Sequence, residues 1–232
     1  MPHDVEKEVA ARASLRFVRD GAVVGLGSGS TATDVLRLLG ERVRAGLKIL
    51  GIPTSRKTAE LAATLGIPLT TFDQFQEIDV TIDGADEFDP QLSLIKGGGG
   101  ALLHEKVVAS ASRQLVIVAD RSKQVPVLGK FPLPIEVIAF AEQLVRKRVE
   151  ALGASVSLRQ SNGRPFVTDE GHHILDCSFG QIPDPPSLAR TLSDMPGIVE
   201  HGLFIDRANV VLIARGNDVT ELNRNNIPKR QS

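Results

Sequence analysis

The sequence has 232 residues, of which 42% are hydrophobic and 24% are charged, and its formal net charge is -1. A chain of this length can bury a substantial core. The near-neutral charge argues against a general nucleic-acid binder, which needs a basic face to neutralise phosphates. The lone cysteine, Cys177, excludes an internal disulfide framework. Residues 1–20 lack the apolar run of a signal peptide, and no segment approaches the roughly 20 apolar residues of a membrane span. We therefore expect a cytoplasmic protein with no nucleic-acid and no membrane partner.

Strand and helix patterns alternate along residues 1–130. Apolar runs predict strands at 22–26, 47–52, 67–70, 78–82 and 115–119, and helical periodicity predicts helices at 5–18, around 34–39, and at 55–65 and 101–108. This alternation is typical of α/β proteins. We expect a mostly parallel, Rossmann-like sheet with helices on both faces.

The pattern changes at the prolines of Phe131-Pro132-Leu133-Pro134. The expected elements are strands at 135–138, 155–158, 173–178 and 198–204, helices at 140–152 and 187–192, and a hairpin around Asn162-Gly163. This order is β-α-β-β-α-β, a smaller α+β domain of the ferredoxin-like, split βαβ type. Residues 210–214 return to the large sheet, and 217–232 read as a polar tail. The predicted domains are therefore 1–130 with 206–232, and 131–205.

Four consecutive glycines, Gly97–Gly100, lie between Lys96 and the helix expected at 101–108. Glycine costs more backbone entropy than any other residue, so such a run weakens the fold unless the backbone must approach something closely. The free N–H groups and the dipole of a helix N-terminus favour negative charge. The run predicts an anion site, with Glu105 about one turn into the helix; a flexible linker is the alternative.

A second glycine loop, Gly27-Ser28-Gly29-Ser30-Thr31, joins a buried strand to a helix. Its spacing is neither that of a dinucleotide fingerprint nor that of a Walker loop. The hydroxyl groups and backbone N–H groups at a helix start are nevertheless suited to a phosphate. A tight turn with a Ser/Thr cap is the alternative.

Carboxylates follow the expected strand 78–82 in the run Asp83-Gly84-Ala85-Asp86-Glu87. The carboxyl ends of parallel strands are where open α/β sheets bind ligands. Lys123, in the loop after the strand at 115–119, belongs to the same edge. The alternatives for the acidic run are a solvated turn, or a hard-cation site that would include Asp89. The run lacks the spacing of a calcium loop, so acid–base chemistry is favoured.

Two segments resemble metal-binding motifs but lack the required ligands or their geometry. His104-Glu105 begins like a zinc-protease helix, but position 108 is Val rather than His. His172-His173 with Cys177 imitates a metal cluster, yet adjacent histidines on a strand point to opposite faces. We expect no bound metal.

Four segments together resemble the type A ribose-5-phosphate isomerases, in family order and with similar spacing. They are Gly25–Thr31, Asp83–Glu87, Lys96–Gly100 with His104-Glu105-Lys106, and Asp120–Lys123. The resemblance implies an isomerase that interconverts D-ribose 5-phosphate and D-ribulose 5-phosphate through an enediolate, in the non-oxidative pentose phosphate pathway. It also implies that no metal or organic cofactor is needed and that the protein is a homodimer, with a homotetramer as the alternative.

The same resemblance implies a role for each site residue. Glu105 is the base that moves the proton, Asp83 helps to open the sugar ring, and Lys96 lies with Asp86 near the reacting carbons. The implied substrate-binding residues are Lys7, Ser28, Gly29, Ser30, Thr31, Asp83, Gly84, Ala85, Asp86, Lys96, Gly97, Gly98, Gly99 and Lys123. Family members often have Thr where this chain has Ser28, a change that keeps the hydroxyl group.

Two other classes of protein could use a similar sheet with phosphate loops. A sugar-phosphate sensor of a transcription regulator should carry a basic helix-turn-helix segment, and no segment of this chain reads as one. A sugar-phosphate deaminase or a coenzyme A transferase would also place a carboxylate on a loop, so the assignment to isomerases depends on the four segments together.

Overall fold

The computed structural model describes residues 2–227, which form two compact units. Of the described residues, the first unit contains 2–85, 104–124 and 206–227, and the second contains 86–103 and 125–205. These limits differ from the predicted domains mainly in placing 86–103 with the second unit. The predicted domain boundaries stay a prediction, and their last residues, 228–232, lie outside the described part of the chain.

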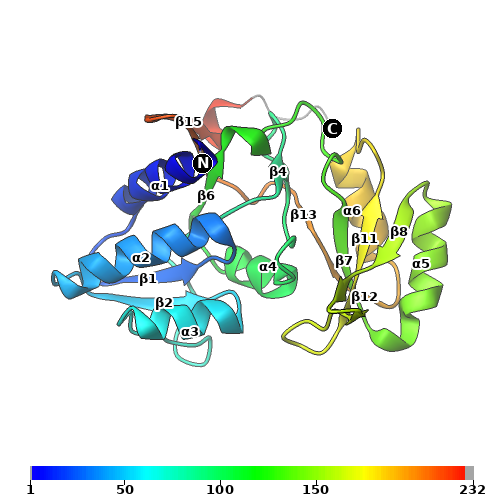
Figure 1. The fold of residues 1–232 in the computed structure, drawn as a ribbon, viewed down its shortest axis with the longest axis horizontal. Coiled ribbons are helices and arrows are strands. Elements are labelled where there is room, and N and C mark those ends of the chain that lie inside the picture. Colours follow the sequence, from blue (N-terminus) through cyan, green and yellow to red (C-terminus); the bar gives the residue numbers. More distant parts are fainter. Residues whose placement is uncertain (1, 228–232) are drawn as a thin grey trace. The chain divides into compact units, whose positions relative to one another are not determined.

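The first unit is built on a six-stranded sheet in the order β15-β14-β6-β3-β1-β2 (Figure 1). Its strands are β1 (Ala22–Leu26), β2 (Ile49–Pro53), β3 (Val80–Asp83), β6 (Leu115–Asp120), β14 (Val210–Arg215) and β15 (Asp218–Asn223). Every neighbouring pair is parallel except β14 with the edge strand β15. The four central strands, β1, β3, β6 and β14, are apolar and almost wholly buried, as expected for strands covered on both faces.

Helices cover both faces of this sheet. They are α1 (Pro2–Ser14), α2 (Ser30–Arg44), α3 (Arg56–Thr64) and α4 (Leu102–Ser110), with short 3-10 turns η1 (Leu15–Phe17), η2 (Arg121–Lys123) and η4 (Arg224–Asn226). Alternate residues of β1 separate the faces: Val24 packs in the core with α1 and α2, whereas Val23 packs with Val108 of α4. The predicted Rossmann-like sheet is confirmed.

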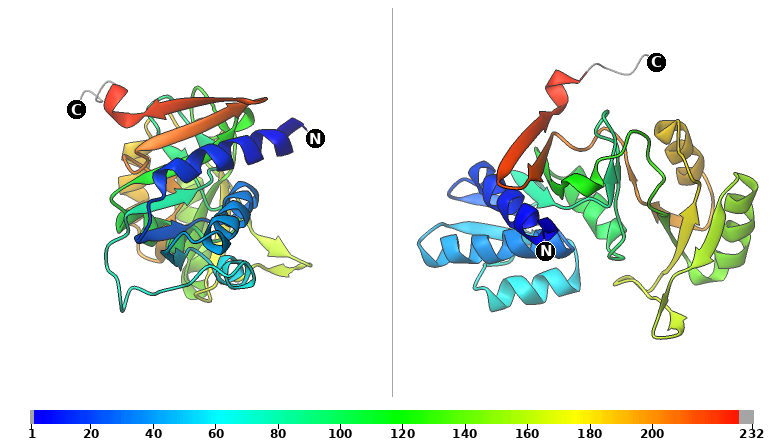
Figure 2. Two further views of the ribbon diagram at one scale, coloured as in Figure 1. Left: turned by 90° about the vertical axis from the view of Figure 1, so that its left-hand side faces the viewer. Right: turned by 45° about the horizontal axis from the view of Figure 1, so that its top comes forward.

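The second unit contains a four-stranded antiparallel sheet in the order β12-β7-β11-β8. Its elements are β7 (Leu133–Val137), η3 (Ala139–Ala141), α5 (Glu142–Ala151), β8 (Ser155–Leu158), β9 (Gln160–Ser161), β10 (Arg164–Pro165), β11 (His173–Ser178), α6 (Pro185–Ser193) and β12 (Ile198–His201). Without the small β9–β10 hairpin, the order is β-α-β-β-α-β, as predicted. Figure 2 shows this hairpin, in yellow-green, extending from the end of the sheet.

A three-stranded sheet in the second unit was not predicted. It consists of β4 (Glu87–Phe88), β5 (Leu94–Ile95) and β13 (Leu203–Phe204), in the order β13-β5-β4. The strand expected at 198–204 is split at Gly202, where an added Cβ would lie 2.4 Å from the carbonyl oxygen of Lys96. The chain passes at this glycine from one sheet to another.

Two further predictions of secondary structure were wrong. Residues 218–223 of the expected polar tail form β15, which pairs with β14 (Figure 2). Its residues are mostly polar because the strand is at an edge. The strand expected at 67–70 makes only an isolated pairing between Leu69 and Gly51.

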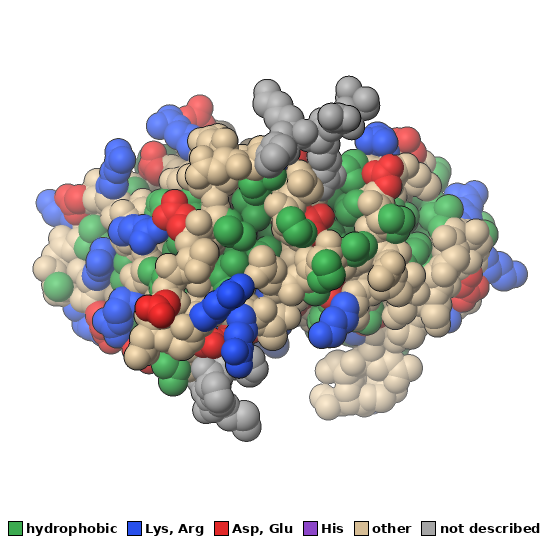
Figure 3. Space-filling model, turned by 90° about the horizontal axis from the view of Figure 1, so that it is seen from above, with side chains coloured by type: hydrophobic (Ala, Val, Ile, Leu, Met, Phe, Trp, Pro, Cys, Tyr) green, Lys and Arg blue, Asp and Glu red, His purple; other side chains and the backbone are tan. Residues whose placement is uncertain are grey.

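Charged side chains of both signs are interspersed on the face drawn in Figure 3. Among the described residues, no helix is both long enough and apolar enough to span a bilayer. The mixture of charges on this face agrees with the formal net charge of -1.

Candidate active site

Two predicted site segments meet at the carboxyl edge of the first unit's sheet. Strands β1 and β3 are parallel neighbours. From β1 the chain continues to β2 on one side, whereas from β3 it continues, through residues 84–114, to β6 on the other. The point where connections diverge in this way is the usual ligand site of an open α/β sheet. The loop 27–31 and the residues after Asp83 leave the sheet there.

Asp83 is fixed by the backbone of both segments. It is the last residue of β3 and only 1% exposed. Its Oδ1 accepts hydrogen bonds from the N–H of Ser28 at 3.1 Å and from the N–H of Gly84 at 2.8 Å. Gly27 permits this contact, because an added Cβ there would lie 2.3 Å from Asp83 Oδ1. Gly84 and Ala85, which follow, are half-buried.

The Ser28 hydroxyl points into a cluster of other hydroxyl groups. Its Oγ lies 2.8 Å from Thr54 Oγ1, 2.9 Å from Ser55 Oγ and 3.0 Å from Thr58 Oγ1. Thr54 Oγ1 in turn donates to the carbonyl oxygen of Leu26 at 3.0 Å. The hydroxyl group of Ser28 therefore braces the loop, and its contact with substrate stays a prediction.

Helix α2 begins within this loop without a side-chain cap. Gly29 precedes the helix with φ 95° and provides no capping side chain. The first N–H groups of a helix have no acceptor inside the helix, and its dipole favours negative charge there. Ser30 is exposed and Thr31 is 8% exposed. This helix start has the donors that a phosphate needs.

The beginning of α1 reaches the same edge through Glu6, which is 3% exposed. Its Oε1 accepts from the N–H of Gly216 at 3.1 Å and lies 3.7 Å from Nε of Arg121. Gly216 follows β14 and Arg121 follows β6, so both mark carboxyl ends of strands. Lys7, beside Glu6, and Lys123, the last residue of η2, therefore belong to this edge. Both lysines are partly exposed.

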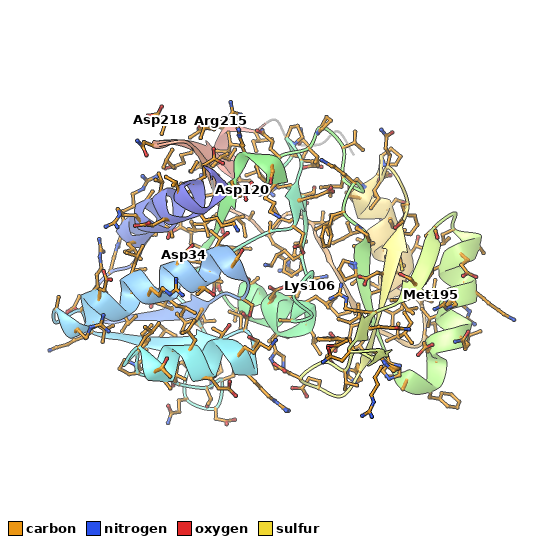
Figure 4. The ribbon with its side chains drawn as sticks, viewed as in Figure 1. Asp34, Lys106, Asp120, Met195, Arg215 and Asp218 are labelled. Carbon is orange, nitrogen blue, oxygen red and sulfur yellow. The ribbon has the colours of Figure 1, made fainter. Side chains whose placement is uncertain are left out.

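Glu105 is directed to this edge by the course of α4. Just after the helix, the carbonyl oxygen of Ala111 accepts from the N–H of Ile78, near the amino end of β3, at 2.9 Å. One turn before, Val108 packs so close to β1 that a Cβ at Gly25 would lie 2.7 Å from it. Glu105 is about 4.5 Å of helix rise further toward the carboxyl ends of the strands. It is 5% exposed. Figure 4 labels its neighbour Lys106 in α4, and Asp120, the last residue of β6.

The glycine run of the second unit is a tight turn. The N–H of Gly100 donates to the carbonyl oxygen of Gly97 at 2.9 Å, and the N–H of Gly98 donates to Asp86 Oδ2 at 2.7 Å. Asp86 is thus held by the glycine run as Asp83 is held by the loop 27–31.

Lys96, directly before the glycines, is buried in the second unit. It is 2% exposed, and its N–H donates to the carbonyl oxygen of Gly202 at 2.9 Å. Its Nζ lies 5.6 Å from the centre of the Phe204 ring. Lysine side chains are rarely buried this deeply in proteins, so Lys96 is a candidate for a functional role.

The four glycines are not equivalent. Gly97 and Gly100 have positive φ values of 96° and 85°, and a Cβ at Gly100 would lie 2.5 Å from the Phe166 ring. A Cβ at Gly98 would lie 2.5 Å from a carboxylate oxygen of Asp86. Only Gly99 is outside the positive-φ region and has no atom within 4 Å of an added Cβ. The fold explains three of the glycines and leaves Gly99 unexplained.

The remaining acidic residues have local structural roles. Glu87 accepts from the N–H groups of Gly129 at 2.9 Å and Phe131 at 2.5 Å. Asp89 Oδ1 accepts from the N–H groups of Gln91 at 2.9 Å and Ser93 at 2.8 Å. Among residues 2–227, no three His, Cys, Asp or Glu side chains are grouped as a metal site.

Comparison with known proteins identifies the family. The model of the family described as ribose 5-phosphate isomerase A (phosphoriboisomerase A) matches residues 50–218. This chain belongs to that family. A ribose-5-phosphate isomerase A of Bradyrhizobium diazoefficiens is 50% identical over 235 aligned residues, which cover 97% of this chain and 98% of the relative. One of Agrobacterium fabrum is 52% identical, covering 88% of this chain and 91% of the relative. The chain is therefore an isomerase.

Solved structures of ribose-5-phosphate isomerases share the fold. A D-ribose-5-phosphate isomerase in complex with phospho-erythronic acid has a TM-score of 0.94 and 38% identity, and the match covers 97% of this chain and 100% of that one. The ribose 5-phosphate isomerase of Plasmodium falciparum has a TM-score of 0.91 and 38% identity, covering 96% and 99%. The resemblance seen in the four sequence segments is confirmed.

Some residues that support the candidate site could not be recognised from the sequence alone. Glu6 anchors the first turns of α1, and Thr54 and Thr58 hold the Ser28 hydroxyl. Arg159 donates to the glycine run from a distant part of the chain. None belongs to a recognisable motif, because each is defined by a contact with residues far away in sequence.

Proposed function

We propose that this protein interconverts D-ribose 5-phosphate and D-ribulose 5-phosphate through an enediolate, with Glu105 as the base. The observation that carries the proposal is the placement of Glu105, a buried carboxylate at the start of α4, at the strand edge where Asp83 is held. Family membership supports the substrate class.

The reaction moves one proton between adjacent carbons. Glu105 removes the proton from C2 of the open-chain aldose, and the electron pair forms the C1–C2 double bond while O1 takes negative charge. The O2 proton passes to O1, and Glu105 returns its proton to C1, which leaves the carbonyl group at C2. One carboxylate on one face of the substrate can perform both transfers.

The other residues receive supporting roles. Asp83 accepts the hydroxyl proton during ring opening, and Lys96 and Asp86 act beside the reacting carbons. A buried ammonium group is suited to stabilise the enediolate oxygens, because electrostatic interactions are strong where water is excluded. The donors proposed for the phosphate are Lys7, Ser28, Gly29, Ser30, Thr31 and Lys123.

The direct test is to mix the pure protein with ribose 5-phosphate and to follow ketose formation. Ribose without the phosphate should be a far poorer substrate, because binding energy of the phosphate is lost. Phospho-erythronic acid, which is bound by the related solved structure, has a carboxylate that resembles the two enediolate oxygens. It should inhibit competitively. Binding of ribose 5-phosphate without turnover would instead favour a sensor, and release of ammonia from an amino-sugar phosphate would favour a deaminase.

We expect activity to persist after exhaustive chelation, because a glutamate base and a lysine can carry the reaction without a metal. The measurement is the rate of ketose formation before and after treatment with EDTA. If turnover were lost and then restored by a divalent ion, the hard-cation alternative would return.

We also propose that the protein is a cytoplasmic homodimer that acts in the non-oxidative pentose phosphate pathway. Support comes from the family alone. Sedimentation equilibrium over a range of protein concentrations distinguishes a dimer from a tetramer or a monomer.

A further inference from the structure

Arg159, in the turn between β8 and β9, joins the glycine run to the four-stranded sheet of the second unit. Its Nη1 donates to the carbonyl oxygens of Gly97 at 2.9 Å and Gly98 at 3.1 Å. Its Nε and Nη2 donate to the two carboxylate oxygens of Asp176, in β11, at 2.9 Å and 2.5 Å. The side chain is 14% exposed. A paired, nearly buried guanidinium of this kind has a fixed orientation.

These bonds fix the direction of two peptide groups. In a trans peptide the C=O and the following N–H point in opposite directions. Because the Gly97 carbonyl faces Arg159, the N–H of Gly98 faces the other way and reaches Asp86. The Gly98 carbonyl also faces Arg159, so the N–H of Gly99 points away from the guanidinium. Gly99 itself is exposed.

Phe166, which directly follows β10, supports the same arrangement. Its N–H donates to the carbonyl oxygen of Arg159 at 2.8 Å, and its ring centre lies 5.9 Å from the guanidinium carbon. The ring packs against Gly100, where a Cβ would lie 2.5 Å from it. Arg159 and Phe166 thus support the glycine turn, and the exposed residue Gly99 is the one whose surroundings they leave open.

We propose that Arg159 is a positioning residue that orients the Gly98–Gly99 peptide so that the N–H of Gly99 donates to the developing enediolate oxygen. The inference rests on the proposed isomerase function and deepens it. A fixed peptide donor gains its effect because it needs no reorientation during the reaction. The opposing interpretation is that Arg159 only ties the turn to the sheet.

The test compares Arg159→Met with Arg164→Met, which removes an exposed arginine from β10 of the same hairpin. For Arg159→Met we expect kcat to fall about 10²-fold, the usual scale for losing one oxyanion donor, with KM for ribose 5-phosphate changed by less than about threefold. The affinity for phospho-erythronic acid, the enediolate mimic, should fall in parallel with kcat. The Arg164→Met variant should match the unmodified protein in all three quantities.

Arg159→Lys keeps the charge beside Asp176 but not the fork that reaches two carbonyl groups. It should show an intermediate kcat, and it carries the test if Arg159→Met does not fold. A folded variant with kcat within twofold of the unmodified protein would overturn the inference, as would equal losses of affinity for ribose 5-phosphate and phospho-erythronic acid. Absence of turnover by the unmodified protein in the same assay would instead overturn the proposed function and this inference with it.

Discussion

The two glycine loops hold a carboxylate in similar ways but use their glycines differently. In the loop 27–31, an added Cβ at Gly27 would strike Asp83, and Gly29 has a positive φ at the start of α2. In the run 97–100, the same two constraints account for every glycine except Gly99. The first loop contains N–H groups at a helix start and hydroxyl groups, which are suited to a ligand. The second loop contains a glycine, Gly99, that neither a clash nor a positive φ explains.

This difference separates the glycines that the fold requires from one, Gly99, that the fold does not require. A glycine with a clash or a positive φ is explained by the structure itself. Gly99 has neither. Our proposal that substrate approaches the backbone closely at this position gives a physical reason for a glycine there. Substitutions in the second loop therefore test whether each glycine is needed for the fold or for activity.

Among the substitutions in the two glycine loops, Gly98→Ala should have the largest effect. Its Cβ would lie 2.5 Å from Asp86 Oδ1, so either the turn or the carboxylate must move. We expect kcat/KM to fall by at least about 10²-fold, because a displacement of about 1 Å near a reacting group can have this effect. Thermal unfolding should also occur at a lower temperature, as for other overpacked sites. A variant with wild-type rate and stability would show that the turn is not held as described.

Gly99→Ala should affect function without affecting the fold. An added Cβ meets no atom within 4 Å and the backbone is outside the positive-φ region. We therefore expect an unfolding temperature close to that of the unmodified protein, with kcat/KM reduced about tenfold or more by contact of the methyl group with substrate. Gly153→Ala, at a strained glycine distant in sequence from the site, is the converse control: it should lower stability and leave kcat unchanged.

Lys123→Ala tests whether Lys123 binds the phosphate at the carboxyl edge of the sheet, the edge where the loop 27–31 also lies. A phosphate remote from the reacting carbons contributes mainly binding energy, so KM should rise about 10- to 100-fold, the scale of one charged hydrogen bond, while kcat changes little. Steady-state kinetics with ribose 5-phosphate gives both constants. If kcat collapsed while KM stayed constant, Lys123 would belong to the chemical step.

The smallest effect should follow treatment with a thiol reagent. Burial raises the pKa of Cys177 to about 12 from 9.0. At pH 8 about one thiol in 10⁴ is ionised, and the thiolate is the reactive form. We expect native protein to resist iodoacetamide and to keep its full activity, whereas unfolded protein should react. The raised pKa also means that this thiol's contribution to stability is full below pH 9 and is lost as the pH rises toward 12. Rapid alkylation with loss of activity would contradict the burial.

Sequence predicted the fold where apolar runs were long. The buried strands 22–26 and 173–178 were placed at their observed bounds, because a continuous or alternating apolar pattern leaves few other structures. The two-residue strands β4, β5 and β13 have too few residues to show a period. The strand β15 has polar residues at an edge, so its sequence resembles a tail.

The candidate site was predicted as far as its motifs extend. The loops around Ser30 and Gly98 and the position of Glu105 could be assigned because glycine runs and strand ends have local signatures. Arg159 could not, since its partners Gly97 and Gly98 are more than 60 positions away in sequence. The inward direction of the Ser28 hydroxyl also depends on distant residues, the hydroxyl cluster at 54–58.

The proposed mechanism requires the buried carboxylate of Glu105 to move the proton, and the substitution Glu105→Gln removes this carboxylate. Gln keeps the size of the side chain but cannot accept the proton, so kcat should fall by roughly 10²- to 10⁴-fold, the scale of a general base. Binding of ribose 5-phosphate, measured by calorimetry, should change little, and Glu60→Gln, at an exposed position of α3, should behave as the unmodified protein. Near-normal turnover by a folded Glu105→Gln protein would show that Glu105 is not the base and would make Asp83 or Asp86 the next candidate.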